Sequence, residues 1–457
     1  MDERVAARIF ICSLVLYIVL YGVFVTGGFQ LDWPNIYILI IFIPILLIDC
    51  LKTAVESFLP RNFLKGKEES SKITTIIPTR DGADTLAATL EDLLKRFKPE
   101  RIIVSSNGST DATDDIARKY GVTLFSTEEP IGKVEAINRA LPLVETEYTL
   151  ILDDDVLIGN AVMPTDPLGD TYAGVAFRVL PKPGNWVTSM QLHEYRKSMD
   201  IGKGFHNMFA TVQNISGAIG LFKTAELIRQ VPLHTGEFSG EDLQRTLLIH
   251  LSDESRGVVI TDSLVETDVP NTLLDLYHQR ISGWSPGLFA NIGNYLKIMV
   301  KKRTPFALRY DAFYNVFLVA ALDPLRCIAL PIIFFYPVIT VLFYITYILL
   351  ESIPYFVLKA REPLWVVLLF PFFGIFNFVT RMTALVVFIY RRFAVFLARS
   401  RALDDYRYTK TRYRVASIFL STMLIWIVLT LALVSTKYAT AQKIFTGLNE
   451  VTVHLQK

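Results

Sequence analysis

Three consecutive carboxylates, Asp153, Asp154 and Asp155, follow the apolar run 148–152. Carboxylates this close repel one another, so the arrangement is costly unless a cation or hydrogen-bond donors compensate for it. A divalent metal that carries a phosphorylated substrate would supply that compensation. A solvated turn or an acidic helix start is the alternative. Because long apolar segments lie on both sides of this polar region, the triplet indicates chemistry at a membrane face.

Two earlier segments have the form of strand ends followed by turns. The first, with Pro78 and Asp81, predicts a strand, a turn and a helix start, so that backbone N–H groups point above the sheet. In an open parallel sheet, nucleotides bind at this edge. The second, 105–111, has Asn107 in a small-residue turn that can read a base edge, or that simply caps a helix.

A lone lysine, Lys133, follows Gly132 just inside a predicted helix start. This position suits the diphosphate of a bound nucleotide better than a packing role. A solvated surface lysine is the alternative.

The elements that must position these residues alternate along the polar region. Short β-rich runs at 73–77, 102–105, 123–126 and 149–152 are separated by helix-like stretches such as 85–97 and 113–120. This alternation predicts an α/β domain with a mostly parallel sheet.

Composition places the chain among membrane proteins. It has 457 residues, of which 52% are hydrophobic and 12% aromatic, with a net charge of only +2. No run of Lys and Arg with interleaved aromatic residues is long enough for a nucleic-acid surface, so a nucleic-acid partner is excluded. The cysteines, Cys12, Cys50 and Cys327, have no metal-ligand spacing and are expected to be small buried hydrophobes.

Five uncharged stretches are expected to span a bilayer: 9–26, 34–48, 327–350, 364–380 and 415–435. A cleaved signal peptide is the alternative for the first stretch. The segment 313–322 is too short to cross and is expected at the interface. The basic loop 391–414 is then cytoplasmic, and counting crossings places the α/β domain on the same side of a multi-pass protein of the cell membrane.

The expected organisation has five parts. They are an N-terminal transmembrane hairpin (1–60), a cytosolic catalytic domain (70–302), interfacial helices (303–325), a C-terminal transmembrane region (326–436) and a tail (437–457).

In this order and spacing, the motifs resemble those of family 2 glycosyltransferases of the GT-A type, which bind a nucleotide sugar at their strand ends. The resemblance continues with Ser216-Gly217-Ala-Ile-Gly220 and with Gly240-Glu241-Asp242-Leu243. It ends with His278-Gln279-Arg280-Ile-Ser-Gly283-Trp284, which looks like the signature of the processive, membrane-embedded members such as hyaluronan, cellulose and chitin synthases. The motifs cover about residues 70 to 290.

The resemblance implies roles for individual residues. Asp153 would contact the ribose or the metal, and Asp155 would ligate Mg or Mn bound to the diphosphate. In the Glu241–Asp242 pair, Asp242 would be the general base, so that the transfer inverts the anomeric centre. Trp284 would form an aromatic wall for the acceptor, with a buried core tryptophan as the alternative. The implied nucleotide-sugar site comprises Pro78, Asp81, Asn107, Lys133, Asp153, Gln279, Arg280 and Trp284.

Three positions depart from the family pattern. Ser106 and Asn107 replace an Asp pair that contacts uracil, and Arg80 stands where many members have a tyrosine against the base. Gly283 replaces the second arginine of the last signature, which removes a cation from the diphosphate neighbourhood.

The resulting hypothesis is a membrane glycosyltransferase that extends a polysaccharide from a nucleotide-diphosphate sugar, expected to be a UDP-sugar. Its partners would be that donor, a growing glycan or lipid acceptor, and membrane lipid. The first alternative is non-processive transfer of one sugar to a lipid or lipid-linked acceptor, which Gly283 favours. A transporter or channel subunit is the second alternative, but the expected spans carry almost no charge apart from Arg381.

Overall fold

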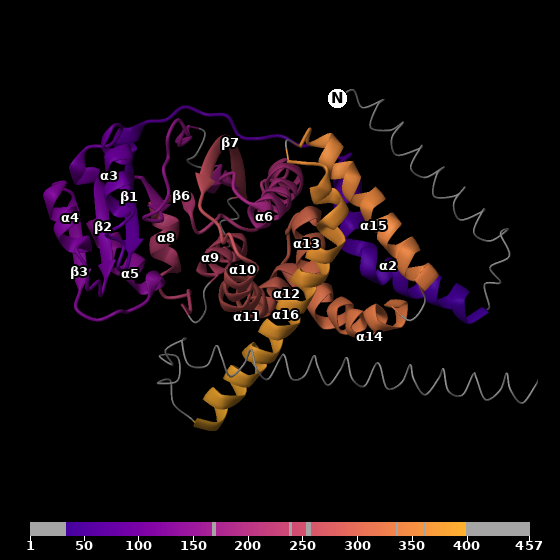
Figure 1. The fold of residues 1–457 in the computed structure, drawn as a ribbon. Helices are drawn as coiled ribbons and strands as arrows, with labels where there is room; N and C mark the ends of the chain where they lie inside the picture. Colours follow the sequence, from indigo (N-terminus) through magenta and orange to yellow (C-terminus); the bar gives the residue numbers. More distant parts are fainter. Residues whose placement is uncertain are drawn as a thin grey trace, which may run out of the picture.

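The computed structural model describes residues 33–166, 171–236, 240–252, 257–334, 337–360 and 362–398. Two of the expected spans, 9–26 and 415–435, lie outside these residues, as do Cys12 and the tail. Figure 1 shows a sheet with its helices at one end of the molecule and a group of long helices at the other.

A seven-stranded sheet forms one half of the described molecule, in the order β3-β2-β1-β4-β6-β5-β7. The strands are β1 (Ile73–Thr79), β2 (Ile102–Asn107), β3 (Thr123–Thr127), β4 (Tyr148–Leu152), β5 (Tyr172–Pro181), β6 (Ile219–Lys223) and β7 (Gly257–Thr267). Strands β1 to β4 are parallel to one another, and β5 is parallel to β7, whereas β6 runs antiparallel to β4 and β5. The expected mostly parallel sheet is confirmed.

The central strands are apolar because helices cover both faces of the sheet. Every residue of β1, β2 and β4 is buried, as is usual for parallel strands. The surrounding helices are α3 (Leu86–Leu94), α4 (Thr113–Lys119), α5 (Lys133–Ala140), α6 (Trp186–Arg196), α7 (Gly204–Asn207), α8 (Thr224–Gln230) and α9 (Glu241–Leu251), with short turns η1 (Ser70–Lys72), η2 (Pro99–Arg101) and η3 (Leu141–Leu143). A π-helical stretch, η4 (Lys197–Lys203), joins α6 to α7.

Short helices connect the sheet to the long ones. They are α10 (Leu273–Gln279), the π-helical η5 (Arg280–Trp284), α11 (Ser285–Ala290), α12 (Ile292–Val300), α13 (Phe306–Phe317) and the π-helical η6 (Leu318–Leu322). The segment expected at the interface thus forms the end of α13 and η6.

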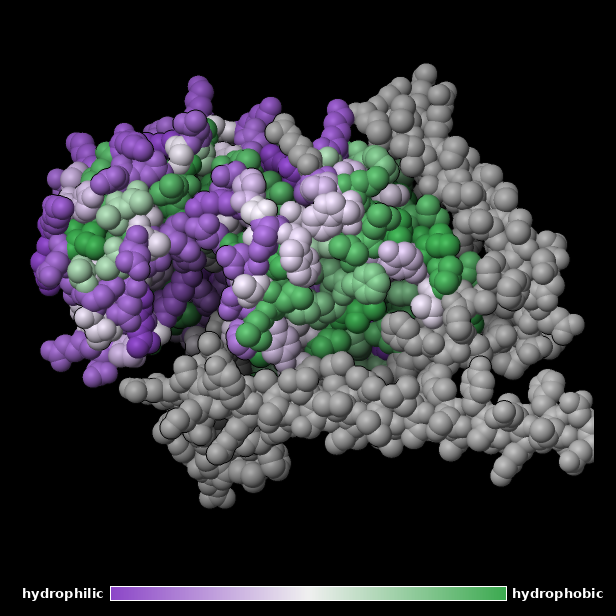
Figure 2. Space-filling view, in the orientation of Figure 1, coloured by the Kyte–Doolittle hydropathy of each residue, from purple (hydrophilic) through white to green (hydrophobic). Residues whose placement is uncertain are grey.

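The long helices are α2 (Trp33–Glu56), α14 (Asp323–Phe334), α15 (Pro337–Val357) and α16 (Trp365–Ala398). Within the described residues, two helical segments are long and apolar enough to cross a bilayer, Ile339–Val357 and Trp365–Ile389. Figure 2 shows the corresponding contrast, with hydrophilic side chains over the β1–β3 end and hydrophobic ones over the helical group.

The expected boundaries in this region need correction. The stretch 327–350 is divided between α14 and α15, so it is not one continuous span. The stretch 364–380 lies in α16, and this helix continues to Ala398, so the first part of the predicted basic loop is helical. The stretch 34–48 lies in α2, which extends to Glu56. Cys50 is buried as expected, while Cys327 is half-buried.

Four charged side chains pair with one another among the long helices. Asp323 of α14 accepts hydrogen bonds from Arg326 Nη1 (3.0 Å) and from Arg381 Nε (2.9 Å) of α16. Arg326 Nη2 lies 2.9 Å from Asp49 Oδ2 of α2, and Tyr314 of α13 donates to the other oxygen of Asp49. The pairing satisfies charges that would be costly alone in an apolar surrounding.

Candidate active site

The acidic triplet lies at the carboxyl end of β4, beside β6. The backbone N–H of Asp153 donates to the carbonyl oxygen of Ala218 (2.9 Å), which fixes the start of the triplet. Asp154 points the other way, since its carboxylate accepts from Thr79 Oγ1 and its carbonyl oxygen accepts from Thr89 Oγ1 (2.7 Å). Asp154 therefore anchors the turn, and the carboxylates of Asp153 and Asp155 take no part in this anchor.

Lys133 joins the triplet to the Glu241–Asp242 pair. It is the first residue of α5, and its Nζ lies 2.7 Å from Asp153 Oδ1 and 3.1 Å from Glu241 Oε1. Glu241 is the first residue of α9. The two acidic segments, predicted to converge from sequence positions far apart, are thus brought together around one ammonium group.

Gly217 gives Asp242 its place in the same cluster. The N–H of Gly217 donates to Asp242 Oδ2 (3.1 Å), and the N–H of Leu243 donates to Asp242 Oδ1 (2.8 Å). A Cβ atom at position 217 would lie 3.7 Å from Lys133 Nζ and from Glu241 Oε1. The glycine therefore lets the cation and both carboxylates approach one backbone turn.

The two carboxylates of the pair have opposite pKa shifts. Burial acts to raise the pKa of Glu241, but the neighbouring Lys133 ammonium outweighs it and holds the pKa at about 2. Burial raises the pKa of Asp242, and the charge of Glu241 raises it further. Neighbouring carboxyl groups whose pKa values are pushed apart are typical of an acid-base site, and here Asp242 is the more basic member.

Asp155 is a carboxylate that has no cationic partner among the described residues. Burial raises the pKa of Asp155, and the charges of Asp154 and Asp268 raise it further. Asp268 lies just after the end of β7. Among the described residues, no Lys, Arg or His lies within ion-pair distance of Asp155, and no three His, Cys, Asp or Glu side chains are grouped to hold a metal. Asp153 and Asp155 are the two carboxylates that would hold a divalent ion here, as the sequence predicts.

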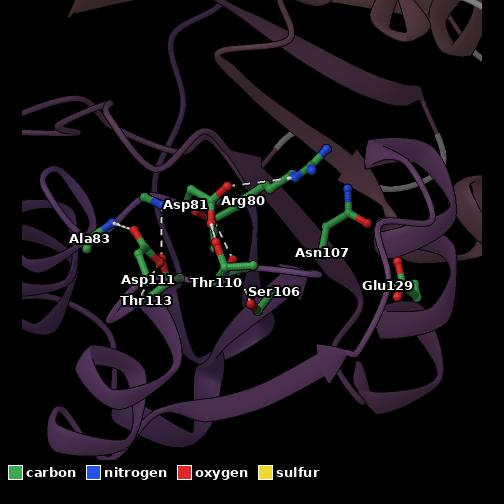
Figure 3. Close-up of polar contacts among 12 residues, drawn as sticks. Arg80, Asp81, Ala83, Ser106, Asn107, Thr110, Asp111, Thr113 and Glu129 are labelled. Atoms are coloured by element: carbon green, nitrogen blue, oxygen red, sulfur yellow. Dashed lines mark hydrogen bonds and ion pairs between the residues drawn. The ribbon is translucent and has the colours of Figure 1, made fainter. Parts of the chain in front are cut away.

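The loops that follow β1 and β2 are locked to each other, as Figure 3 shows. Asp81 Oδ1 accepts from the N–H of Thr110 (2.7 Å) and from its hydroxyl (3.2 Å). In return, Asp111 Oδ2 accepts from the N–H of Ala83 (3.0 Å). Asp81 therefore holds the rim of the site together, and Pro78 is buried inside β1.

Asn107 binds the loop that precedes α5. Its side-chain oxygen accepts from the N–H of Ile131 (2.7 Å) and of Gly132 (3.2 Å). Both lone pairs of this oxygen are therefore used within the protein, and the role of Asn107 in nucleotide binding stays a prediction.

Arg280 pairs with a carboxylate of α6. Its guanidinium forms a two-point ion pair with Glu194, at 3.1 Å to Oε1 and closer to Oε2, and it stacks on Trp284 with 4.2 Å to the ring centroid. Gln279 Oε1 is buried without a partner among the described residues. The Gln279–Trp284 segment thus lies beside α6 and α16, and the carbonyl oxygen of Gly283 also approaches the start of α9, 3.3 Å from where a Cβ atom on Gly240 would lie.

Trp284 is 47% exposed, so it is not a buried core tryptophan. Its ring lies 5.6 Å from that of Tyr195. Burial raises the pKa of the Tyr195 hydroxyl to about 12, and the charge of Asp242 contributes to that shift. Tyr195 therefore lies near enough to Asp242 for that charge to act on its hydroxyl, and Trp284 packs beside it.

Sequence reasoning missed several residues of this neighbourhood: Glu194, Tyr195, Lys203 and Asp268. Burial lowers the pKa of Lys203 to about 8, against the effect of the Asp242 charge. No local motif marks these residues. Their contacts cross many residues of sequence, so only the packing of α6 and η4 against the other elements brings them to the site.

The mostly parallel sheet, the outer carboxylates at the end of β4 and the lysine that bridges Asp153 to the Glu241–Asp242 pair are the features of a GT-A-like α/β domain. Residues 74–162 match the family described as glycosyl transferase family 2. The family resemblance predicted from the order of the motifs is confirmed for these residues.

The chain is also similar to curated relatives. It is 23% identical over 270 residues to a poly-beta-1,6-N-acetyl-D-glucosamine synthase of Staphylococcus aureus (strain MSSA476), covering 54% of this chain and 63% of that protein. It is 25% identical over 237 residues to the Staphylococcus epidermidis protein of that name, covering 47% and 54%. The match thus spans less than two thirds of each relative.

Among solved structures, a mannosyltransferase from Pyrobaculum calidifontis, in complex with GDP-Man and Mn2+, is 15% identical. The alignment covers 76% of this chain and 98% of that one, with a TM-score of 0.49.

Proposed function

We propose that this protein is a membrane glycosyltransferase that extends a polysaccharide, using a nucleotide-diphosphate sugar, with a UDP-sugar as the expected donor. The observation that carries the proposal is the bridge from Asp153 through Lys133 to the Glu241–Asp242 pair. It brings a diphosphate-binding cation and a buried base within one cluster. The likeness to poly-beta-1,6-N-acetyl-D-glucosamine synthases supports a polysaccharide product.

In this proposal, the residues of the cluster have separate roles in an inverting displacement. Asp242, whose pKa is raised, takes the proton of the acceptor hydroxyl as that oxygen attacks the anomeric carbon. Lys133 stabilises the negative charge that develops on the leaving diphosphate. A Mg or Mn ion held by Asp153 and Asp155 would neutralise more of that charge when bound.

The long helices support a location in the membrane, with the catalytic domain on the cytoplasmic side. Trp284 offers an exposed ring for the C–H face of an acceptor sugar and stacks on Arg280, which pairs with Glu194. Asn377 of α16 donates to the same Glu194 (3.0 Å), so the acceptor end of the site adjoins the helical group.

The substitution Asp242→Asn tests the proposed base. It should lower kcat by about 10²–10⁴-fold, because proton transfer is lost, while nucleotide affinity stays near that of the unmodified protein. Purified protein in membranes would be given labelled nucleotide sugars, followed by transfer assays and nucleotide-binding measurements. Wild-type turnover in the variant would refute the assignment of the base.

Sizing the labelled product separates the two modes of transfer. A ladder or a high polymer supports polysaccharide extension, whereas a single adduct that moves with lipid supports the transfer of one sugar to a lipid acceptor. Absence of transfer from every nucleotide sugar would contradict the proposal as a whole.

A further inference from the structure

The α12–α13 turn, residues 300–306, exposes two large hydrophobic side chains. Val300 ends α12 and is 80% exposed, and Phe306 begins α13 and is 83% exposed. They are the most exposed large hydrophobic side chains of the described residues. On the two helical segments that are apolar enough to cross a bilayer, the highest exposure is 60%, at Phe372. Apolar surface of this kind marks a contact with another protein or with lipid.

The exposed apolar surface continues along α13. Phe306, Tyr310 and Phe313 share one face of this helix, and all three are exposed. The rings of Phe306 and Tyr310 are stacked, with their centroids 6.4 Å apart. These side chains form an aromatic strip that begins at the turn, on a helix that Figure 1 shows between the sheet and the long helices.

Helix α2 places this strip at the level where an expected span ends. Lys52 Nζ of α2 lies 3.5 Å from Asp311 Oδ1 of α13, so the two helices are adjacent there. The exposed Leu51 and Val55 lie on the same part of α2, after the expected span 34–48 and before the chain enters the sheet. In the proposed orientation, this level is the cytoplasmic surface of the bilayer.

Cations accompany the exposed apolar side chains. Lys302 and Arg303 lie within the turn and Lys297 lies one helical turn before it; all three are exposed, and none forms an ion pair in the part of the chain that the structure describes. The segment 291–322 contains one acidic residue, Asp311, which already pairs with α2. A surface that is both basic and apolar is complementary to anionic headgroups and to the hydrocarbon beneath them.

Lys301 fixes the turn to the end of α9. Its Nζ donates to the carbonyl oxygens of His250, at 3.1 Å, and of Ser252. From α13, Arg309 Nη2 donates to the carbonyl oxygen of Lys301 (2.8 Å). Behind the turn, buried apolar side chains of α9, α12 and α13 form one cluster, which comprises Leu247, Tyr295, Ile298, Leu308 and Ala312. The turn is thus attached to the helix whose first turn carries the proposed base.

We propose that the α12–α13 turn binds the anionic lipid headgroups of the cytoplasmic leaflet, and that this docking restrains α9 and thereby raises the rate of transfer. The inference rests on the membrane location in the proposed function, but not on the identity of the donor or the product. The charge of the turn favours lipid over a second copy of this chain, because a two-fold contact would bring like charges together.

Spin labels test the docking without any sugar substrate. Phe306→Cys would be labelled in a chain whose native cysteines are replaced by alanine, and reconstituted in phosphatidylcholine with or without phosphatidylglycerol. With phosphatidylglycerol, the label should be accessible to oxygen and shielded from a water-soluble nickel complex; without it, or at high salt, this shielding should weaken. Ile228→Cys, an exposed apolar position of α8, is the control and should contact water in both bilayers.

Three results of the label measurement would overturn the docking. The first is a label at position 306 that contacts water in both bilayers. The second is a label that lies equally deep in both, which would mean that the anionic headgroups have no part. The third is a label shielded from oxygen and from the nickel complex alike, which would mean that protein covers this face.

Transfer rates in the same two bilayers test the restraint of α9. Phosphatidylglycerol should raise the rate of the unmodified protein about fivefold or more, since each cation near an anionic surface favours docking by about this factor. The double substitution Lys302→Gln and Arg303→Gln should remove most of this stimulation. Lys98→Gln with Lys119→Gln, two exposed cations of the sheet half, is the matched control and should keep it. Equal rates in the two bilayers, or full stimulation of the first double variant, would overturn the restraint.

The two measurements separate this inference from the proposed function. If no nucleotide sugar is transferred in either bilayer, the proposed function fails, while the labels still decide whether the turn docks. If transfer occurs and anionic lipid does not change its rate, the proposed function stands and the lipid-dependent restraint of α9 is wrong.

Discussion

At the scale of single residues, the site depends on one lysine that makes two adjacent carboxylates different. Lys133 lies 3.1 Å from Glu241 and keeps it ionised, and the resulting charge raises the pKa of Asp242. In the proposed mechanism Glu241 therefore acts on Asp242 through its charge and is not itself the base. This division of roles follows from which carboxylate faces the ammonium group.

The pH dependence of the reaction tests that division. Because Asp242 must be deprotonated to act as a base, kcat/KM should rise with pH through its pKa, which lies above the ordinary value for aspartate. Glu241→Gln removes a negative charge that opposes ionisation of Asp242, so the acidic limb of the profile should move to lower pH. Profiles of kcat/KM against pH, measured for the unmodified protein and for Glu241→Gln, would show this shift. A limb that stays in place, or moves to higher pH, contradicts the assignment.

The proposed metal role of Asp155 can be tested by itself. Asp155→Ala should remove the dependence of nucleotide affinity on Mg or Mn, because one of two oxygen ligands for the ion is lost. Titrations with and without each metal measure this. Asp115→Ala, an exposed aspartate on α4, is the control and should keep the metal dependence. Equal affinity in the unmodified protein with and without metal would count against the metal site.

At the scale of elements, local pattern predicts β1 to β4 within a residue or two, because each is an apolar run bounded by turn residues. It does not reveal β6, since Ile219–Lys223 follows glycine-rich sequence that resembles a turn. The strand exists because β4 and β5 both pair with it. Pairing partners distant in sequence decide such a strand, and no local periodicity records them.

Local sequence patterns also do not reveal which distant residues pair within the site. The acidic triplet and the Glu241–Asp242 pair were predicted to meet, and they do so through Lys133. Arg280 was expected in the nucleotide-sugar site, and the sequence did not predict that it pairs with Glu194 of α6. A sequence motif identifies which residue types chemistry needs, whereas the partner that neutralises a buried charge depends on packing between distant helices.

Gly240, which precedes α9, packs closely against Gly287 of α11. Gly240 has φ +109, and a Cβ atom there would lie 2.9 Å from the Cα of Gly287 in α11. Gly240→Ala should therefore lower kcat and the thermal transition together, because α11 would have to move away from the turn that begins α9. The strain of a positive φ alone is about 1–2 kcal/mol, and the steric clash adds to it.

Gly121→Ala is the matched control for this prediction. Gly121 also has a positive φ, +69, but no atom lies within 4 Å of its added Cβ. It should cost stability through strain alone and leave kcat unchanged. If Gly240→Ala behaves like Gly121→Ala in both transfer assays and thermal unfolding, close packing at this turn does not position the base.

At the scale of the whole molecule, Glu194 connects the catalytic half to the helical half. It accepts from Arg280 of η5 and from Asn377 of α16, and α16 also packs against α6 and α11. These contacts join the long helices to the segment that carries Trp284, the proposed acceptor end of the site. We therefore expect changes at Glu194 to affect both halves of the molecule.

Glu194→Gln should loosen this junction. Arg280 would stay buried without a carboxylate, and removing one partner of a buried pair costs roughly 3–5 kcal/mol, with the low end expected because Glu194 is partly exposed. Thermal unfolding in detergent should show a lowered transition. Asp115→Asn, which removes one member of an exposed pair with Arg118, should not change it. Equal transitions in the two variants would argue against the coupling.

The ionic cluster of the long helices has a consequence for biosynthesis. Asp49 leaves the ribosome early, on α2, whereas Arg326 and Arg381 are made only after the complete α/β domain. Until then the aspartate has no cation from α14 or α16 beside it, which disfavours deep burial of that turn of α2. We therefore expect α2 to dock late in assembly, after α14 and α16 have been synthesised.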